Sequence, residues 1–216
     1  MKVLPILLSK ETALEILRGH RTSIRKVVKP KYGKDECGFQ VITIYRKKDE
    51  KYAEKTDTNG KGFTPPHIVK PPYQVGDVLW VQERCCQLKN DGKYFYATDR
   101  GTNLEERKLL DYNNAAWKSA LTMPKEAARI WLKITDVYLE RLQDISDEEA
   151  KKEGANFSNG KHVGWEEKMR RTAAERFAER WDVHNNPESE KYSWNSNPWV
   201  WVIHFEKCEK LEKETK

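Results

Sequence analysis

The sequence contains no long apolar run. A transmembrane helix needs about 18 consecutive apolar residues, and no run in this chain approaches that length. The first apolar stretch, MKVLPILL, turns polar at Ser9, too early for the apolar region and cleavage site of a secretory signal. We therefore expect a soluble protein with a cytoplasmic location and no membrane partner.

Cysteine is scarce, and the common catalytic and cofactor motifs are missing. The four cysteines, Cys37, Cys85, Cys86 and Cys208, include no CxxC pair. Adjacent Cys85 and Cys86 on a strand would point to opposite faces and could not share one tetrahedral metal, so reduced thiols are expected. The five histidines are scattered, and GxGxxG, P-loop, GxSxG and HExxH motifs are absent. We expect neither a metal nor a cofactor.

The apolar residues that are present are bulky. Hydrophobic residues make up 38% of the 216-residue chain and charged residues 34%, a balance that borders on that of disordered chains. The eight tryptophans, at roughly 150 to 250 Å² each, can nevertheless remove about 1,200 to 2,000 Å² from water. The length fits one decorated domain better than two small ones. We predict a single domain over residues 1–207, with a polar insertion near 46–64 and a charged tail over 208–216.

Hydrophobic periodicity predicts short strands mixed with a few helices. One helix is predicted from the N-cap Ser9 to Gly19, followed by a loop over residues 19–23. A capping box of Ser146 and Glu149 predicts a short helix that ends at Gly154. A longer amphipathic helix is predicted at 165–182, and strands at 3–8, 39–45, 78–83, 94–98, 128–142 and within 194–206. This order lacks regular βαβ alternation, which favours the α+β class with a small closed or half-closed sheet.

Positive charge is concentrated near the N-terminus. The chain has a net charge of +6, but residues 1–75 hold 16 Lys+Arg against 8 Asp+Glu, and the remainder holds 24 against 26. Seven cations without an acid occupy residues 18–34, namely Arg18, Arg21, Arg25, Lys26, Lys29, Lys31 and Lys34. Such a block is typical of a site for a polyanion such as RNA or DNA, and the alternative is a solvated basic face with no partner.

The residue types around this block suit phosphate and bases. Guanidinium groups and the hydroxyls of Thr22 and Ser23 can contact phosphate, and His20 lies beside them. Tyr32 and Tyr73 are candidates for base stacking. The predicted nucleic-acid-binding residues are Arg18, His20, Arg21, Arg25, Lys26, Lys29, Tyr32 and Asp77. If about four cations contacted single-stranded RNA, log affinity would fall with log salt at a slope near −3.

Several motifs resemble one known family. They are GHRTSIR at 19–25, KPPYQVGDVLWV at 70–81, MPKEAARI at 123–130, ERLQDIS at 140–146 with Glu149-Ala150 and Glu153-Gly154, and NPWVWV at 197–202. In this order they resemble the ASCH (activating signal cointegrator homology) proteins carried by phages and prophages. The resemblance runs from about residue 4 to 206, apart from the stretches near 46–64 and 99–116. It implies a mixed β-barrel of the PUA (pseudouridine synthase and archaeosine transglycosylase) type, flanked by helices, and a link to RNA or modified nucleosides.

One branch of that family, the N4-acetylcytidine amidohydrolases, uses a Lys, a Thr and a Glu. The resemblance places Arg21 at the Lys position, Ile24 or Ser23 at the Thr position, and Glu153 at the Glu position. Arginine keeps its proton and isoleucine offers no nucleophile, so two of the three positions are altered. Amide hydrolysis would then need Thr22 or Ser23 as nucleophile and Glu153 as acid or base.

The sequence therefore favours binding over catalysis. The leading hypothesis is an ASCH protein that binds RNA, or a nucleoside or nucleotide, in a basic cleft. The alternative is a hydrolase that acts on a modified nucleoside, or a ribonuclease in which Arg21, Arg25 and Lys26 stabilise developing charge. A third hypothesis is an interaction module for a host protein.

Overall fold

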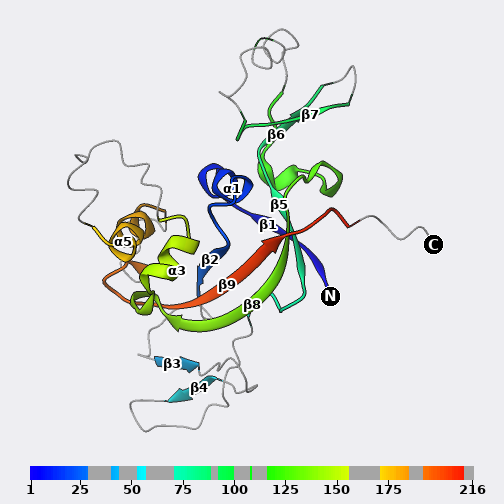
Figure 1. Ribbon diagram of the computed structural model, residues 1–216. Coiled ribbons are helices and arrows are strands. Elements are labelled where there is room, and N and C mark those ends of the chain that lie inside the picture. Colours follow the sequence, from blue (N-terminus) through cyan, green and yellow to red (C-terminus); the bar gives the residue numbers. More distant parts are fainter. Residues whose placement is uncertain are drawn as a thin grey trace. The chain divides into compact units, whose positions relative to one another are not determined.

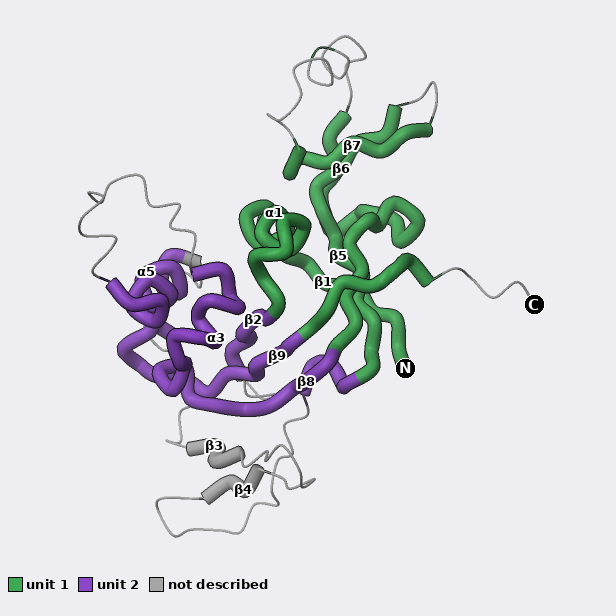
Figure 2. Tube along the Cα trace, in the orientation of Figure 1, with its two compact units in different colours: residues 1–22, 76–134, 205–216 green, residues 23–75, 135–204 purple. Residues whose placement is uncertain are grey.

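The structure is a computed structural model of the 216-residue chain (Figure 1). It describes residues 1–28, 40–43, 53–56, 71–88, 92–99, 108, 116–155, 171–184 and 192–211. The chain divides into two compact units (Figure 2): unit 1 comprises residues 1–22, 76–134 and 205–216, and unit 2 comprises residues 23–75 and 135–204.

Unit 1 is built on strand pairs from distant parts of the sequence. Its elements are β1 (Val3–Leu7), α1 (Lys10–Leu17), β5 (Val78–Gln82), β6 (Cys85–Gln87), β7 (Tyr94–Tyr96), the 3-10 helices η1 (Ala120–Thr122) and η2 (Lys125–Ala127), the start of β8 (Trp131–Arg141) and the end of β9 (Trp199–Lys207). Strand β1 runs parallel to β5, β5 runs antiparallel to β8, and β6 forms a hairpin with β7.

Unit 2 contains the rest of β8 and β9 and the helices that follow β8. Its other elements are β2 (Ser23–Val27), β3 (Gln40–Thr43), β4 (Ala53–Thr56), η3 (Leu142–Asp144), α3 (Asp147–Lys152) and α5 (Ala173–His184). Strand β2 runs antiparallel to β9 with Arg25 opposite Val202, and β3 pairs with β4.

The main sheet is mixed and open. Its strand order is β1-β5-β8-β9-β2. Strand β8 runs antiparallel to β9: the amide of Cys208 donates to the carbonyl of Trp131 at 2.9 Å, and the amide of Leu142 donates to the carbonyl of Pro198 at 3.0 Å. The predicted α+β class is confirmed. Closure into a barrel is wrong for the described strands, because β1 pairs only with β5 and β2 only with β9, which leaves both at the sheet edges.

Helix α1 begins and ends where its sequence predicts. The Ser9 hydroxyl accepts the amide of Thr12 at 3.2 Å. At the other end Gly19 has a φ of 75°, and the amides of Gly19 and His20 donate to the carbonyls of Ile16 and Glu15 at 3.0 and 2.9 Å. This Schellman motif needs a left-handed residue, which glycine supplies without strain.

The six predicted strands are confirmed, and three further strands, β2, β4 and β6, are not predicted by the sequence. The strands at 3–8, 39–45, 78–83, 94–98, 128–142 and 194–206 correspond to β1, β3, β5, β7, β8 and β9. The predicted loop 19–23 ends one residue early, because Ser23 already starts β2. Three consecutive residues of β2, from Ser23 to Arg25, are buried, so the strand lacks the alternation that a sequence search detects.

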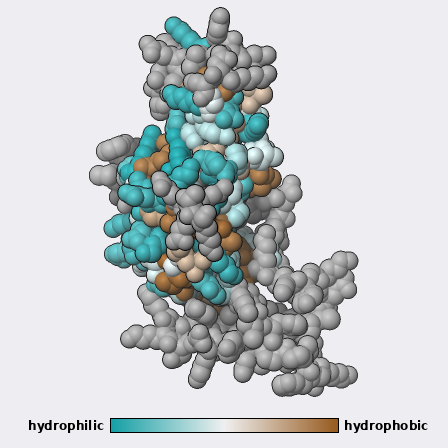
Figure 3. Space-filling model, turned by 90° about the vertical axis from the view of Figure 1, so that its right-hand side faces the viewer, coloured by the Kyte–Doolittle hydropathy of each residue, from teal (hydrophilic) through white to brown (hydrophobic). Residues whose placement is uncertain are grey.

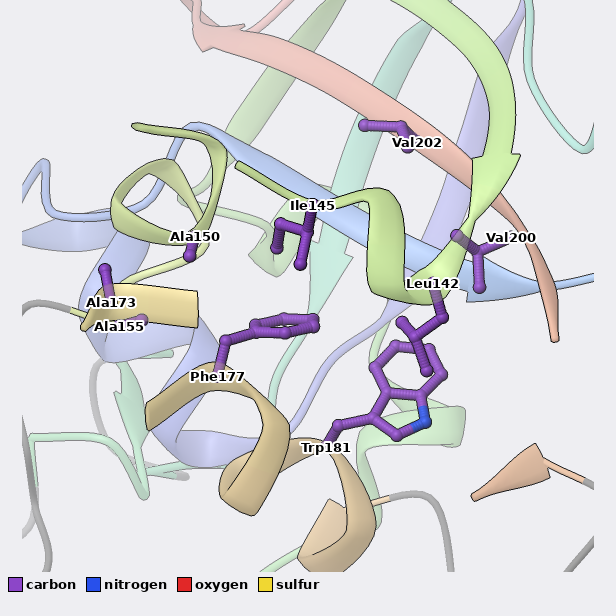
Figure 4. Packing of buried hydrophobic residues seen from close by; sticks show 9 residues of the cluster. All are labelled: Leu142, Ile145, Ala150, Ala155, Ala173, Phe177, Trp181, Val200 and Val202. Atoms are coloured by element: carbon purple, nitrogen blue, oxygen red, sulfur yellow. The ribbon is translucent and has the colours of Figure 1, made fainter. Parts of the chain in front are cut away.

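The core of unit 2 lies between its helices and the sheet (Figure 4). Helix α5 directs Phe177 and Trp181 toward Leu142 and the strand residues Val200 and Val202. The amphipathic helix predicted at 165–182 is confirmed over Ala173–His184, and its predicted part before residue 171 lies outside the described residues. Each such buried side chain contributes about 1.5 to 3 kcal/mol before entropy is counted.

An arginine network fixes the β6–β7 hairpin in unit 1. The Arg129 guanidinium lies 2.9 Å from Glu83 and 2.6 Å from Asp99, and it covers the Tyr96 ring at 3.9 Å from the centroid. Thr98 donates to the same Glu83 carboxylate at 2.6 Å. Because these groups satisfy one another, we interpret the network as structural.

The visible surface is mixed in polarity. In Figure 3 hydrophilic and hydrophobic residues alternate over the coloured part of the face shown. Among the described residues, no helix has the length and apolar character needed to cross a membrane.

Candidate functional site

The first cations of the basic run belong to unit 1 and come directly after α1. Arg18 is the C-cap residue of this helix and is exposed to solvent, as is Thr22, whereas His20 is half-buried. The carbonyl of Thr22 accepts the amide of Phe205 at 2.9 Å, which ties this segment to β9. Arg18 therefore presents its charge to solvent from a fixed backbone.

Arg21 turns back toward its own helix. Its Nη1 atom donates to Glu15 Oε2 at 3.1 Å and to Thr12 Oγ1 at 3.2 Å. The side chains of Arg21 and Glu15 are only 12% and 9% exposed. Glu15 thus compensates the positive charge of Arg21, which the sequence analysis expects to contact a polyanion. As an arginine, Arg21 cannot act as a base.

Asp77 has a structural contact at the start of β5. It is buried, and its Oδ1 atom accepts the backbone amide of Lys2 at 2.8 Å. The amide of Val78 in turn donates to the carbonyl of Lys2 at 2.8 Å. These two bonds attach the N-terminal strand to β5.

Arg25 is the centre of a buried ion cluster in unit 2. Its Nη2 atom lies 2.5 Å from Glu140 Oε1, and its Nη1 atom donates to Glu153 Oε1 at 3.0 Å. The Arg25 side chain is 0% exposed, that of Glu153 1%, and that of Glu140 17%. The guanidinium carbon also lies 5.7 Å from the centroid of the Phe177 ring. We call Arg25, Glu140 and Glu153 the Arg25 triad.

Burial and charge in the triad shift the pKa values of Arg25 and Glu140. Burial by itself would lower the pKa of Arg25, but the charges of Glu153 and Glu140 outweigh burial and raise it. Burial raises the pKa of Glu140, and the charge of Arg25 opposes that rise. Two carboxylates against one guanidinium leave the triad with a net negative charge when all three are ionised.

The end of α3 holds Glu153 in place. Glu153 is the C-cap residue, and Gly154 after it has a φ of 80°. Arg180 of α5 donates to the carbonyls of Glu153 and Gly154, and Arg176 donates to the carbonyl of Ala155 at 2.8 Å. These bonds satisfy helix-end carbonyls and fix the backbone that carries the buried carboxylate.

A second polar group lies along β8, β9 and α3. The rings of Tyr138 and His204 stack with centroids 5.8 Å apart, and the Tyr138 hydroxyl lies 3.5 Å from His204 Nε2. The same Nε2 atom lies 3.2 Å from Glu149 Oε2, and Lys152 donates to Glu149 Oε1 at 2.8 Å. His204 is thus packed against the Tyr138 ring and lies close to the Glu149 carboxylate.

The protonation of this group follows from burial and neighbouring charge. Burial lowers the pKa of His204, against the charge of Glu149. Burial alone would raise the pKa of Glu149, but the hydrogen bond and the charge of Lys152 lower it overall. Burial also raises the pKa of Tyr138. His204 is therefore favoured in its neutral form.

Lys26 points to the opposite sheet face from Arg25, because successive strand residues alternate. Its Nζ atom donates to the Tyr73 hydroxyl at 3.1 Å and lies 5.0 Å from the centroid of that ring. Lys26 is half-buried, and Tyr73 is buried with 8% exposed. Tyr73 is thus covered by a cation, and Lys26 is held by an uncharged partner.

The predicted residues are divided between the two units. Arg18, His20, Arg21, Thr22 and Asp77 belong to unit 1, and Ser23, Arg25, Lys26 and Glu153 to unit 2. Of these, the structure joins Arg25 directly to Glu153. Ser23 is fully buried at the start of β2. Lys29 and Tyr32 lie outside the described residues.

The sequence does not reveal Glu140 as a partner of Arg25, nor the contacts of His204 with Tyr138 and Glu149. Glu140 lies 115 residues along the chain in β8, and Tyr138 and Glu149 come from β8 and α3. The period-two pattern of 128–142 could have placed Tyr138 and Glu140 on one face, but it could not have paired that face with β2. Among the described residues, no group of three or more His, Cys, Asp or Glu is arranged to hold a metal ion.

Comparison with known proteins yields one structural match. No family model matches the chain, and no curated protein matches it. Among solved structures, the chain is similar to the crystal structure of an ASCH domain from Lactobacillus crispatus JV V101, with 14% identity and a TM-score of 0.34. The match covers 95% of this chain and 79% of the other.

Proposed function

We propose that this protein binds RNA, or a nucleoside or nucleotide, through the basic strand β2 of unit 2. The proposal rests on one observation: the two cations of β2 lie on opposite faces of the sheet. Arg25 faces Glu140 and Glu153, whereas Lys26 on the other face is held by the hydroxyl and ring of Tyr73.

The two cations then have different tasks. Two carboxylates neutralise Arg25 in a buried position, so Arg25 positions β2 and leaves phosphate contacts to other cations. The Tyr73 hydroxyl is uncharged and so does not compensate the Lys26 ammonium among the described residues, and a half-buried ammonium of this kind gains energy from a phosphate oxygen. Arg18 of unit 1, at the end of α1, is exposed to solvent and is a separate candidate for a phosphate contact.

Binding of a labelled single-stranded RNA to the Lys26→Ala variant tests the proposal. We expect weaker binding than for the wild type and a salt slope less steep by about 0.7, the change for one lost phosphate contact. Lys133→Ala is the matched control, because Lys133 is a strand lysine of unit 1 with 53% of its side chain exposed. Equal affinities for the two variants would overturn the role of Lys26, and absence of RNA or nucleotide binding by the wild type would overturn the function.

A second candidate function, hydrolysis of a modified nucleoside or of RNA, is favoured by one observation. Glu140 has a raised pKa and is the more exposed carboxylate of the Arg25 triad, as a general acid or base requires. Glu153, which the family resemblance assigns to this role, is 1% exposed. We therefore propose Glu140 as the acid or base if the protein is a hydrolase.

Incubation with N4-acetylcytidine and, separately, with labelled RNA tests this second function. A hydrolase would turn over one of the two substrates, and Glu140→Gln would abolish the turnover while the protein stays folded. No turnover of either substrate by the wild type would contradict the second candidate and leave the binding function.

A further inference from the structure

The sheet face that carries Lys26 also carries two tryptophans. Lys26 lies opposite Trp201 in the β2–β9 register, and the amide of Val28 donates to the carbonyl of Trp199 at 2.9 Å. Residues opposite each other share a face, as do residues two apart on one strand. Lys26, Trp201 and Trp199 therefore project from the same face within unit 2.

The two tryptophans differ in accessibility. Trp201 is 3% exposed and belongs to the packed interior, whereas Trp199 is half-buried. The Arg141 guanidinium lies over the Trp199 ring with its carbon 4.3 Å from the ring centroid. Arg141 is itself half-buried, so this cation–aromatic pair is in part open to solvent.

The backbone around Trp199 is held in advance by hydrogen bonds. Arg141 Nη1 donates to the carbonyl of Asn197 at 3.0 Å, and the Asn197 side chain accepts the amide of Gln143 at 2.9 Å. The Gln143 side chain donates to the carbonyl of Trp194 at 2.9 Å. The turn before β9 is thus fixed to the end of β8, and little order has to be gained when a ligand contacts the ring.

We propose that Trp199 and Arg141 form a base-stacking subsite for single-stranded RNA, with Lys26 on the same face as a phosphate contact. This inference rests on the proposed RNA-binding function and identifies where a base is held. A planar guanidinium over an indole offers two flat cationic and aromatic surfaces, and bases stack on both kinds. A stacked base with a nearby lysine is the common combination in proteins that bind single strands.

The experiment compares a ligand that has bases with a polyanion that has none. A labelled single-stranded RNA and inorganic polyphosphate of similar charge are titrated against the wild type and the Trp199→Leu, Trp199→Phe and Arg141→Lys variants. Trp80→Leu is the matched control, because Trp80 is a half-buried strand tryptophan of unit 1. Thermal unfolding of every variant checks that the fold persists.

Trp199→Leu removes the surface on which one base stacks, so this variant should bind RNA at least about fivefold more weakly than the wild type. Its binding of polyphosphate should be unchanged. Trp199→Phe should retain most of the affinity because it keeps an aromatic surface, and Arg141→Lys should weaken RNA binding although the charge is kept. The inference is overturned if Trp199→Leu loses no more RNA affinity than Trp80→Leu, or if RNA and polyphosphate affinities fall equally. Failure of the wild type to bind RNA would instead overturn the proposed function.

Discussion

Arg25 shows how the meaning of a residue depends on its partners. In the sequence it is one of seven cations in an acid-free run, and phosphate is the obvious partner. In the structure two carboxylates from β8 and from the end of α3 surround it, and its side chain is fully buried. A buried charge is tolerated only with such compensation.

Removal of Arg25 should therefore destabilise the protein. Arg25→Met leaves Glu153 buried without a cation, which costs about 3 to 5 kcal/mol of unfolding free energy. The unfolding free energy is measured by urea denaturation, with exposed Arg18→Met as the control that should change it by less than about 0.5 kcal/mol. Adding Glu153→Gln to Arg25→Met should restore part of the loss, and equal small losses for Arg25→Met and Arg18→Met would contradict the buried triad.

His204 should make stability depend on pH. An unperturbed histidine has a pKa of about 6.5, and burial holds the pKa of His204 lower in the folded protein. As the pH falls below about 6.5, the unfolded chain binds a proton that the folded protein does not. The contribution of His204 is thus complete above this pH and is lost as the pH falls toward the folded pKa.

The unfolding free energy of the wild type should then drop more steeply between about pH 7 and pH 5 than that of His204→Gln. Urea denaturation at a series of pH values measures both. Parallel profiles for the two proteins would show that His204 is not held neutral by burial.

At the scale of elements, α3 is a short helix that carries Glu149 in its first turn and Glu153 as its C-cap. Its six residues depend on their caps, because a short helix has few internal hydrogen bonds. The Ser146 hydroxyl accepts the amide of Glu149 at 3.2 Å, as the capping box predicts. The Glu149 carboxylate contacts Lys152 and His204, so one residue serves both the start of the helix and the polar group of unit 2.

Loss of this N-cap should be measurable. Ser146→Ala should lower the unfolding free energy by about 1 kcal/mol, and Ser146→Asp should retain most of it because aspartate caps equally well. Thermal or urea unfolding gives the values. If Ser146→Ala is as stable as the wild type, then the packing of α3 against α5, and not the N-cap, stabilises the helix.

Local signals explain why the elements could be predicted and the site could not. Ser9, Gly19, Ser146 and Gly154 act on neighbouring backbone groups, so the bounds of α1 and α3 follow from a few residues of sequence. The Arg25 triad joins positions 115 and 128 residues apart. Which carboxylate meets which cation depends on the order of strands in the sheet, and no local pattern contains that order. The same holds for Arg141 and Trp199.

At the scale of the whole molecule, the net charge of +6 includes cations that ion pairs compensate and cations that they do not. Ion pairs within each unit compensate Arg21, Arg25 and Arg129. The charges that matter for a polyanion are those with neutral partners or with solvent around them, such as Lys26 and Arg18. We therefore expect RNA binding that depends on salt, through fewer cations than the sequence contains.

The most direct test is a titration of the wild-type protein with labelled single-stranded RNA at several salt concentrations between about 50 and 200 mM. The account predicts saturable binding whose log affinity falls linearly with log salt at a slope of up to about −3, less steep by about 0.7 in Lys26→Ala. Absence of saturable binding at the lowest salt, or an affinity that does not change with salt, would contradict it.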